Sequence, residues 1–337
     1  MGSALTIAMI GDGGWGTTLA ILLVKKGYSV RLWSPFAEYA AILREKRENV
    51  KFLPGVAIPR EMTISSDMAQ VLEGAQVVTL AAPSHFMRSV VERMKGFDYS
   101  DRILVSVSKG IENETLLRMS EVIQDVLGRQ KVAVLSGSTI APEVARGLPA
   151  MAVAASDDDR ITARVQEIFS TAAFGVYRGD DIIGAELGGS LKNVIAIAAG
   201  ISDGLGLGTN TKAALFTRGL VEISRLGVKM GARMETFSGL SGMGDLVTTC
   251  LSAESRNRSF GEKVGRGGKM ETLLKETEQV VEGVRTTLSA LALGRRHNKE
   301  MPIALKVKEI LYDGKDSREA VKELMERRRG DELRIGV

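Results

Sequence analysis

Lys192 is the residue whose position in the sequence best suits acid–base chemistry. It stands in an apolar stretch at residues 186–206, with Gly188 and Gly189 about one helical turn before it. A helical side chain folds back over the preceding turn, so the missing side chains there would leave room for the lysine and a small ligand. Burial disfavours the charged form of an amine and favours proton transfer near neutral pH. An ion pair with Glu186 or another acid is the structural alternative.

A second group of polar residues, at 245–257, suits the binding of a phosphate. Asp245 follows a glycine-rich turn, two threonines lie one helical turn after it, and Ser255, Arg256 and Asn257 offer three consecutive hydrogen-bond donors. A guanidinium donates in a fixed, bidentate geometry that matches a phosphate monoester. A solvated loop without a ligand is the alternative for this segment.

The sequence GDGGWG at residues 11–16 places Gly11, Gly13 and Gly16 in the spacing of a dinucleotide-binding fingerprint. It follows the strand-like run LTIAMI and precedes the helix-forming run TTLAILLVKKG. The first glycine permits a tight turn, the second lets the backbone approach a pyrophosphate, and the third lets the helix pack on the strand. The helix N-terminus then faces the anion. We therefore expect a dinucleotide site; the alternative is a glycine-rich turn with no ligand.

The form of the nicotinamide dinucleotide is not fixed by this motif. A carboxylate that binds the ribose hydroxyls is expected at the end of the next strand, YSVRLW, but residues 33–36 are Trp, Ser, Pro and Phe. The first acid is Glu38, and Arg44 or Arg47 could reach a 2′-phosphate. We therefore expect both NAD and NADP to serve.

Ligands of an open parallel sheet bind beyond the carboxyl ends of its strands, so the residues that follow the strands are further candidates. These are APSHF at 82–86, SKG at 108–110 and SGSTIAPEV at 136–144. Lys109 could serve an anionic substrate or cofactor, or extend along the surface into solvent. His85 is a candidate general base, or a loop histidine that caps neighbouring backbone.

The elements that must position these residues form two regions. Up to about residue 180, short apolar runs alternate with helix-like segments, which predicts an α/β domain with a doubly wound, largely parallel Rossmann-type sheet. From about residue 183, long helical patterns punctuated by glycine predict an all-helical domain. We expect a dinucleotide-binding domain at residues 1–181 and a helical substrate-binding and catalytic domain at residues 182–337.

Composition excludes several classes of protein. The 337 residues carry 45 Lys and Arg against 41 Asp and Glu, and a net charge of +4 spread along the chain does not indicate a nucleic-acid partner. The single cysteine, Cys250, excludes an intrachain disulfide and a cysteine-rich zinc site, we expect no metal, and a reducing cytoplasm fits. The uninterrupted apolar runs are far shorter than the roughly 20 residues of a membrane span, so none is expected.

Together, the motifs resemble the NAD(P)-dependent glycerol-3-phosphate dehydrogenases, most closely the bacterial type, over nearly the whole chain. The matching segments, in order, are GDGGWG, ENVKFLPG at 48–55, APSH, SKG, ELGGSLKNVIAIAAGISDGLG, TKAALFTRG, SGMGDLVTTC, SRNRSFG and VVEG at 280–283. A single one of these matches would be weak, but nine in the same order are strong.

The resemblance implies roles for particular residues. Lys192 would donate and accept the proton, and Asp245 would help to position it. The residues implied to contact the substrate are Lys109, Gly137, Thr139, Lys192, Asp245, Ser255, Arg256 and Asn257. Those implied to lie near the cofactor are Gly11, Gly13, Gly14, Trp15, Gly16, Phe36, Phe86, Lys109, Ala141, Arg256 and Glu282.

Two positions depart from the family pattern. The family usually has a proline where this chain has Ser138, which leaves the geometry around Thr139 and Ala141 open. The usual aspartate before Asn210 is Thr209, which we expect to affect only a helix cap.

The resemblance implies an enzyme that interconverts dihydroxyacetone phosphate and sn-glycerol 3-phosphate with NAD(P)H, supplying glycerol 3-phosphate for phospholipid synthesis. The implied partners are a small phosphorylated substrate and a second copy of the chain in a cytoplasmic homodimer. One alternative is a related two-domain reductase of a hydroxy acid without phosphate, against which the donors at 255–257 argue. The other is a non-catalytic dinucleotide sensor.

Overall fold

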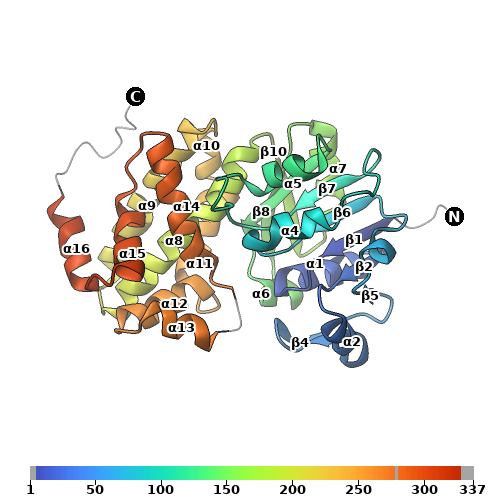
Figure 1. Cartoon of the computed structure of the whole chain (residues 1–337), viewed down its shortest axis with the longest axis horizontal. Coiled ribbons are helices and arrows are strands. Elements are labelled where there is room, and N and C mark those ends of the chain that lie inside the picture. The colour runs from blue at the N-terminus through green and yellow to red at the C-terminus, as the bar shows by residue number, and fades with distance from the viewer. Residues whose placement is uncertain (1–4, 278–279, 328–337) are drawn as a thin grey trace. The chain divides into compact units, whose positions relative to one another are not determined.

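The apolar runs of the first half of the chain form one sheet in the computed structural model, which describes residues 5–277 and 280–327. The chain divides into two compact units (Figure 1). The first comprises the described residues up to Lys109 together with Met119–Ile182. The second comprises Gly110–Arg118 and the described residues from Ile183 onward. The segment Gly110–Arg118 thus belongs with the helical unit, which the expected division at residue 181 did not include.

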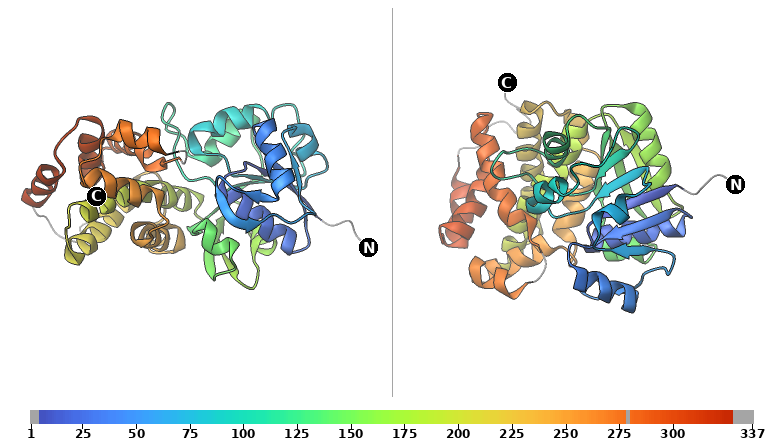
Figure 2. Two further views of the ribbon diagram at one scale, coloured as in Figure 1. Left: turned by 90° about the horizontal axis from the view of Figure 1, so that it is seen from below. Right: turned by 45° about the vertical axis from the view of Figure 1, so that its right-hand side comes forward.

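The first unit is an eight-stranded sheet with helices packed against it (Figure 2). Its strands are β1 (Thr6–Ile10), β2 (Ser29–Trp33), β5 (Thr63–Ser65), β6 (Val77–Leu80), β7 (Ile103–Ser106), β8 (Val132–Ser138), β9 (Ala150–Ala155) and β10 (Phe174–Gly179). Their spatial order is β10-β9-β8-β7-β6-β1-β2-β5. Neighbouring strands run parallel except β8 and β9, which run antiparallel. The predicted doubly wound, largely parallel sheet is therefore confirmed.

The central strands are buried on both faces, as expected for a sheet with helices on either side. Every residue of β6 is buried, and four of the five residues of β1 are buried. The helices of this unit are α1 (Gly14–Lys25), α2 (Ala37–Lys46), α3 (Met68–Leu72), α4 (Met87–Glu92), α5 (Met119–Leu127), α6 (Ala141–Ala145) and α7 (Asp159–Phe169), with a 3₁₀ turn η1 (Ser84–Phe86). A small antiparallel hairpin of β3 (Glu48–Asn49) and β4 (Leu53–Ala57) follows α2.

The order of the strands reverses between β1 and β6. From β1 the chain proceeds to β2 and β5, and it then returns to β6 on the other side of β1. Open α/β sheets bind their ligands at such a switch point, outside the carboxyl ends of the strands. Residues 11–16 follow β1 at this point.

The second unit is helical in its described residues from Ile183 onward, whereas Gly110–Arg118 contains only turns and an isolated bridge between Ile111 and Arg118. Its helices are α8 (Ile182–Gly204), α9 (Thr209–Lys229), α10 (Met234–Phe237), a π turn η2 (Leu240–Gly244), α11 (Asp245–Leu251), α12 (Arg256–Gly265), α13 (Met270–Glu276), α14 (Glu282–Arg296), α15 (Pro302–Tyr312) and α16 (Ser317–Glu326). By length and composition α8 could cross a membrane, but most of it is buried at the centre of this unit. The predicted all-helical character is confirmed.

Close approach of backbones holds α12 on α8. A methyl group at Gly204 would lie 2.3 Å from the carbonyl oxygen of Glu262, and one at Gly265 would lie 2.4 Å from that of Ile201. Side chains at these positions would force the two helices apart. The N-terminus of α12, which carries Arg256, is therefore held in a fixed place along α8.

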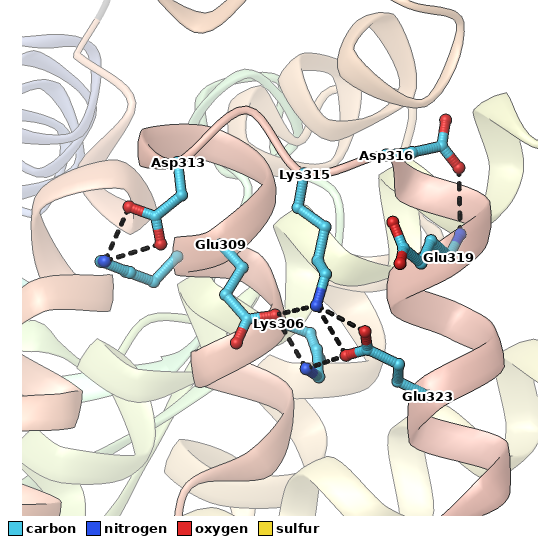
Figure 3. A network of polar contacts seen from close by, with 8 residues as sticks. Lys306, Glu309, Asp313, Lys315, Asp316, Glu319 and Glu323 are labelled. Atoms are coloured by element: carbon cyan, nitrogen blue, oxygen red, sulfur yellow. Dashed lines mark hydrogen bonds and ion pairs between the residues drawn. The ribbon is translucent and has the colours of Figure 1, made fainter.

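The last helix, α16, is fixed to α15 by a network of ion pairs (Figure 3). Lys315 Nζ lies 2.9 Å from Glu309 Oε2 and 2.6 Å from Glu323 Oε1, and Lys306 pairs with both glutamates. Because four charges share the network, it holds the two helices more firmly than one exposed pair would.

Candidate functional site

The glycine turn, residues 11–16, has the geometry that a dinucleotide pyrophosphate requires. Gly11 has φ of +122°, and a methyl group at Gly16 would lie 2.3 Å from the carbonyl oxygen of Gly11. By contrast, apart from Gly13 and its two neighbours in the chain, no described atom lies within 4 Å of where a methyl group at Gly13 would stand. Gly13 is the N-cap of α1, so the helix N-terminus opens onto this space. The residues present therefore fit a bound dinucleotide.

Gly14 and Ala141 are also part of the wall of this turn. A methyl group at Gly14 would lie 2.5 Å from the carbonyl oxygen of Phe52 and 3.9 Å from the Cβ of Ala141. The carbonyl of Ala141 accepts a hydrogen bond from Thr18 Oγ1 at 3.2 Å. Two further residues implied to lie near the cofactor belong to this unit as exposed rings, with Phe36 69% exposed and Phe86 51% exposed.

Trp15 packs inward from the glycine turn. It is half-buried and meets Phe174 edge to face, with the ring centroids 6.1 Å apart. This contact anchors the N-terminal end of α1 on the end of the sheet.

Ser34, at the position where a ribose-binding carboxylate was sought, turns away from solvent. It is fully buried, and its hydroxyl donates to Asp12 Oδ2 at 2.6 Å. Burial raises the pKa of Asp12, and the hydrogen bond from Ser34 opposes that shift. Glu38, the first acid after β2, is exposed in the first turn of α2.

Lys109, Gly137 and Thr139 come together at the carboxyl ends of β7 and β8. Lys109 Nζ donates to the carbonyl oxygen of Gly137 at 3.0 Å, and Thr139 Oγ1 donates to the same oxygen at 3.3 Å. Lys109 is half-buried. Ser138, which replaces the family's proline, pairs with Met151 in the β8–β9 ladder.

In the second unit, Lys192 lies in a buried cluster with Asp245 and Thr249, which we call the lysine cluster. Lys192 is 6% exposed and Asp245 is 1% exposed, and Lys192 Nζ lies 2.7 Å from Asp245 Oδ1. Lys192 also donates to the hydroxyl of Thr249, which in turn donates to Asp245 Oδ1 at 3.3 Å. Lys192 therefore has the acid partner that the structural alternative required, although that acid is Asp245. Glu186 pairs with Arg118.

The role expected of Gly188 is wrong. A methyl group there would lie 2.5 Å from the carbonyl oxygen of Ser241, so the backbone of η2 fills the space beside Gly188 that was expected to hold the lysine and a ligand. Gly188 instead lets η2 approach α8, and η2 leads directly into Asp245. Gly188 thus supports the lysine cluster by letting the segment that carries Asp245 approach the helix that carries Lys192.

Thr249 and Cys250 follow Asp245 on α11. Thr249 appeared in the sequence only as one of the two threonines on the face of Asp245, and its bond to Lys192 could not be read from the spacing. Cys250 is buried, and burial raises its pKa to about 12, so the thiol stays protonated. It is not a nucleophile for this site.

Ser255, Arg256 and Asn257 stand at the start of α12. Ser255 is the N-cap, and its hydroxyl accepts from the N–H of Arg258 at 3.2 Å. Asn257 is held on both sides, since its amide donates to Asn193 Oδ1 and its Oδ1 accepts from the N–H of Gly283, each at 2.9 Å. This fixes Asn257 between α8, α12 and α14 and leaves only part of its donor capacity for a ligand.

Arg256 presents its charge at the same helix start. Desolvation of the Arg256 guanidinium lowers its pKa, and the nearby carboxylate of Glu282 opposes that shift. Arginine remains protonated under all ordinary conditions. A helix N-terminus with a guanidinium beside it is suited to an anion.

One departure from the family pattern is resolved by the structure. Thr209 is the first residue of α9, and the N-cap is Gly208, which makes no side-chain cap. Thr209 is therefore not the cap residue that we expected it to affect; it follows that residue by one position.

In the described ranges no group of three or more His, Cys, Asp or Glu residues is arranged to hold a metal ion.

The chain is similar to known proteins along nearly its whole length. Residues 6–162 and 181–322 match the sequence profiles described as the N-terminus and the C-terminus of NAD-dependent glycerol-3-phosphate dehydrogenase. A glycerol-3-phosphate dehydrogenase [NAD(P)+] of Syntrophotalea carbinolica is 50% identical over 96% of this chain and 98% of its own, and that of Citrifermentans bemidjiense is 48% identical over 95% and 97%.

A solved structure supports the same assignment. The crystal structure of glycerol-3-phosphate dehydrogenase from Coxiella burnetii superposes with a TM-score of 0.93 at 39% identity, covering 96% of this chain and 99% of that one. Because both halves of the family profile and close relatives match the chain, it belongs to the NAD-dependent glycerol-3-phosphate dehydrogenase family.

Proposed function

We propose that this protein interconverts dihydroxyacetone phosphate and sn-glycerol 3-phosphate with NAD(P)H. The observation that carries the proposal is the lysine cluster, a buried ammonium held by one carboxylate and one hydroxyl in a chain that also has a dinucleotide turn. The nicotinamide ring supplies the hydride that reduces C2 of the substrate. Side chains of this protein transfer the proton and bind the substrate.

Lys192 acts as the proton donor in the direction of reduction. Negative charge develops on the C2 oxygen as the carbonyl is reduced, and the ammonium of Lys192 stabilises that charge and delivers a proton to it. Asp245, 2.7 Å from Nζ, favours the ammonium form and directs it. In the reverse direction the neutral amine removes the proton from the C2 hydroxyl.

The start of α12 recognises the substrate phosphate. Arg256 supplies a fixed pair of donors, and the hydroxyl proton of Ser255 remains available because Ser255 uses its oxygen as an acceptor in the N-cap. Asn257, locked by Asn193 and Gly283, adds a donor whose position is set in advance. Lys109 and Thr139, which both bond to the Gly137 carbonyl, are further residues that we assign to the substrate.

The proposal also covers the role of the enzyme in the cell. Glycerol 3-phosphate made by this enzyme supplies phospholipid synthesis, the enzyme is a cytoplasmic homodimer, and both NADH and NADPH are used. A single, buried cysteine suits a reducing compartment.

One assay tests the reaction and separates it from the rival functions. The protein is incubated with NADH and either dihydroxyacetone phosphate or dihydroxyacetone, and the nicotinamide absorbance is followed. Oxidation of NADH with the phosphorylated substrate alone supports the proposal. Turnover of 2-keto acids in place of it would identify a hydroxy-acid reductase, and NADH binding without turnover of either class would identify a sensor.

A further inference from the structure

Asn49 is a fully buried polar residue in the ENVKFLPG segment, to which the reaction assigns no role. It is 0% exposed and belongs to strand β3 of the small hairpin. Its side chain makes four hydrogen bonds, two through Nδ2 and two through Oδ1. An asparagine side chain has two amide protons and two acceptor sites, so its hydrogen-bonding capacity is fully used.

The two donors of Asn49 hold the glycine turn. Nδ2 donates to the main-chain oxygen of Asp12 at 2.7 Å and to Thr17 Oγ1 at 2.7 Å. Asp12 lies between Gly11 and Gly13, and Thr17 lies in the first turn of α1. Asn49 thus fixes the middle of the turn and the start of the helix relative to each other.

The two acceptor bonds hold Asn49 from the opposite side. Oδ1 accepts from the hydroxyl of Tyr39 at 2.6 Å and from the N–H of Phe52 at 3.1 Å. The ring of Tyr39 also packs edge to face on that of Phe52, with centroids 6.0 Å apart. The orientation of the amide is unambiguous, because the Asp12 carbonyl can only accept and the Phe52 N–H can only donate.

The hairpin also touches the glycine turn directly. The carbonyl of Phe52 occupies the space beside Gly14, where a methyl group would lie 2.5 Å from it. The turn is therefore enclosed on this side by residues 49–52, with the Asn49 side chain as the polar link. At Gly13, by contrast, the turn borders open space.

We propose that Asn49 is a positioning residue for cofactor binding: it orders the glycine turn so that the main-chain amides at the start of α1 face the pyrophosphate, without touching the cofactor itself. The inference rests on the proposed function for the identity of the dinucleotide. Its physical basis is preorganisation, because a turn already held in the binding geometry loses less entropy when the ligand arrives. Loss of the two donors would leave the Asp12 carbonyl with only its longer bond from Thr17 Oγ1, at 3.3 Å, and would release the turn from β3.

The test uses Asn49→Asp in the full-length chain. Aspartate keeps the shape and both acceptor sites, but it places an oxygen against the carbonyl of Asp12. We expect the Kd for NADH, measured by fluorescence titration without substrate, to rise by about tenfold or more. In steady-state kinetics the loss should fall on the KM for NADH more than on kcat.

Tyr99→Phe is the matched control for a loss of stability alone. It removes a buried hydrogen bond from the same unit, that of the Tyr99 hydroxyl to the Met94 carbonyl at 2.8 Å, away from the turn. We expect this variant to lower the thermal midpoint and to bind NADH like the wild type. Equal NADH affinity in Asn49→Asp and wild type, or an equal loss in Tyr99→Phe and Asn49→Asp, would overturn the inference.

Tyr39→Phe tests the same link without a change at Asn49, and it keeps the inference testable if Asn49→Asp does not fold. The Tyr39 hydroxyl bonds to Asn49 on the side away from the glycine turn, and phenylalanine keeps the ring contact with Phe52. We expect a rise of about two- to fivefold in the NADH Kd. An unchanged Kd would overturn the inference.

The double variant shows whether Tyr39 acts through Asn49. In the Asn49→Asp background, Tyr39→Phe should change the NADH Kd little further, because the two bonds from residue 49 to the glycine turn are already lost. A full additional effect would mean that Tyr39 acts on the cofactor independently, which would also contradict the inference. Failure of the wild type to bind NADH would count against the proposed function instead, since that result concerns the dinucleotide and not Asn49.

Discussion

The candidate site of the first unit is built from backbone, whereas that of the second unit is built from buried ionised side chains. In the glycine turn the important feature is what is absent, since a side chain at Gly13 would fill the space that is open in the structure. In the lysine cluster the important feature is what is present, a lysine and an aspartate that are both nearly inaccessible to solvent.

The difference has energetic consequences. A turn of main-chain amides binds an anion without burying a charge of its own. Burying an ammonium and a carboxylate carries a desolvation penalty, and removal of one partner leaves an uncompensated charge that typically costs about 3–5 kcal/mol. In the second unit a substitution in the lysine cluster should therefore lower both the activity and the free energy of unfolding. In the first unit a substitution in the glycine turn should act mainly on ligand binding.

Lys192→Ala should produce the largest effect. We expect turnover to fall by about 10²- to 10⁴-fold, the range for a positioned general acid, while the Kd for NADH changes by no more than a few-fold. In the proposed mechanism the lysine acts on the substrate carbonyl, and the dinucleotide turn belongs to the other unit. Steady-state kinetics and NADH titration measure the two quantities separately.

Controls for this variant address the buried partner. Lys192→Ala strands Asp245 in the core, so the thermal midpoint should fall, and the double variant Lys192→Met with Asp245→Asn should recover stability without activity. If cofactor affinity and turnover fell equally in Lys192→Ala, the lysine would be a structural ion-pair partner only.

Arg256→Ala should have the next largest effect. The loss of a charge-assisted hydrogen bond to the phosphate should weaken substrate binding by about 1.5–3 kcal/mol or more, seen as a higher KM for dihydroxyacetone phosphate. Arg256→Lys keeps the charge but not the bidentate geometry and should recover part of the loss. Wild-type protein that used dihydroxyacetone as well as its phosphate would contradict this assignment.

The two units also differ in how far their sites could be predicted from sequence. The strands and the glycine turn depend on local spacing, so the alternating apolar runs predicted a largely parallel sheet, and LTIAMI and YSVRLW predicted β1 and β2. Strand β5, of three residues, and the β3–β4 hairpin gave no periodic signal. The inclusion of Gly110–Arg118 in the helical unit depends on distant partners, such as the bond from Ser190 Oγ to the Gly110 carbonyl at 3.2 Å and the pair of Arg118 with Glu186.

Side-chain contacts between distant residues were the hardest to predict. Lys192 and Asp245 were each singled out, but only the family resemblance suggested that they act together, because 53 positions separate them. The contact of Gly188 with Ser241 and the four bonds of Asn49 have no counterpart in local spacing. Burial and partners of this kind are set by how helices and hairpins pack, which a pattern of residue types does not record.

Discrimination between NADH and NADPH should be small. Ser34 is buried and bonded to Asp12, so no carboxylate at that position repels a 2′-phosphate. We expect specificity constants within about a hundredfold of each other, equivalent to about 2.7 kcal/mol, from parallel steady-state measurements. A preference for NADH beyond about a thousandfold would mean that an acid occupies the ribose site, and loss of that preference in Glu38→Ala would identify the acid.

Gly13→Ala should have the smallest of these effects, and it tests the backbone-built site most directly. Gly13 and Gly208 are both N-caps with extended backbone, and apart from each glycine's own chain neighbours no described atom lies within 4 Å of a methyl group at either position. Alanine at each should therefore cost similar stability, as a poorer N-cap than glycine. Only Gly13→Ala should weaken NADH binding, by about tenfold, because its methyl group enters the space that the pyrophosphate needs. Calorimetric titration with NADH and thermal unfolding of both variants measure the difference. Equal NADH affinity in the two variants would show that the pyrophosphate does not approach Gly13, and the glycine turn would then serve only to pack α1 on the sheet.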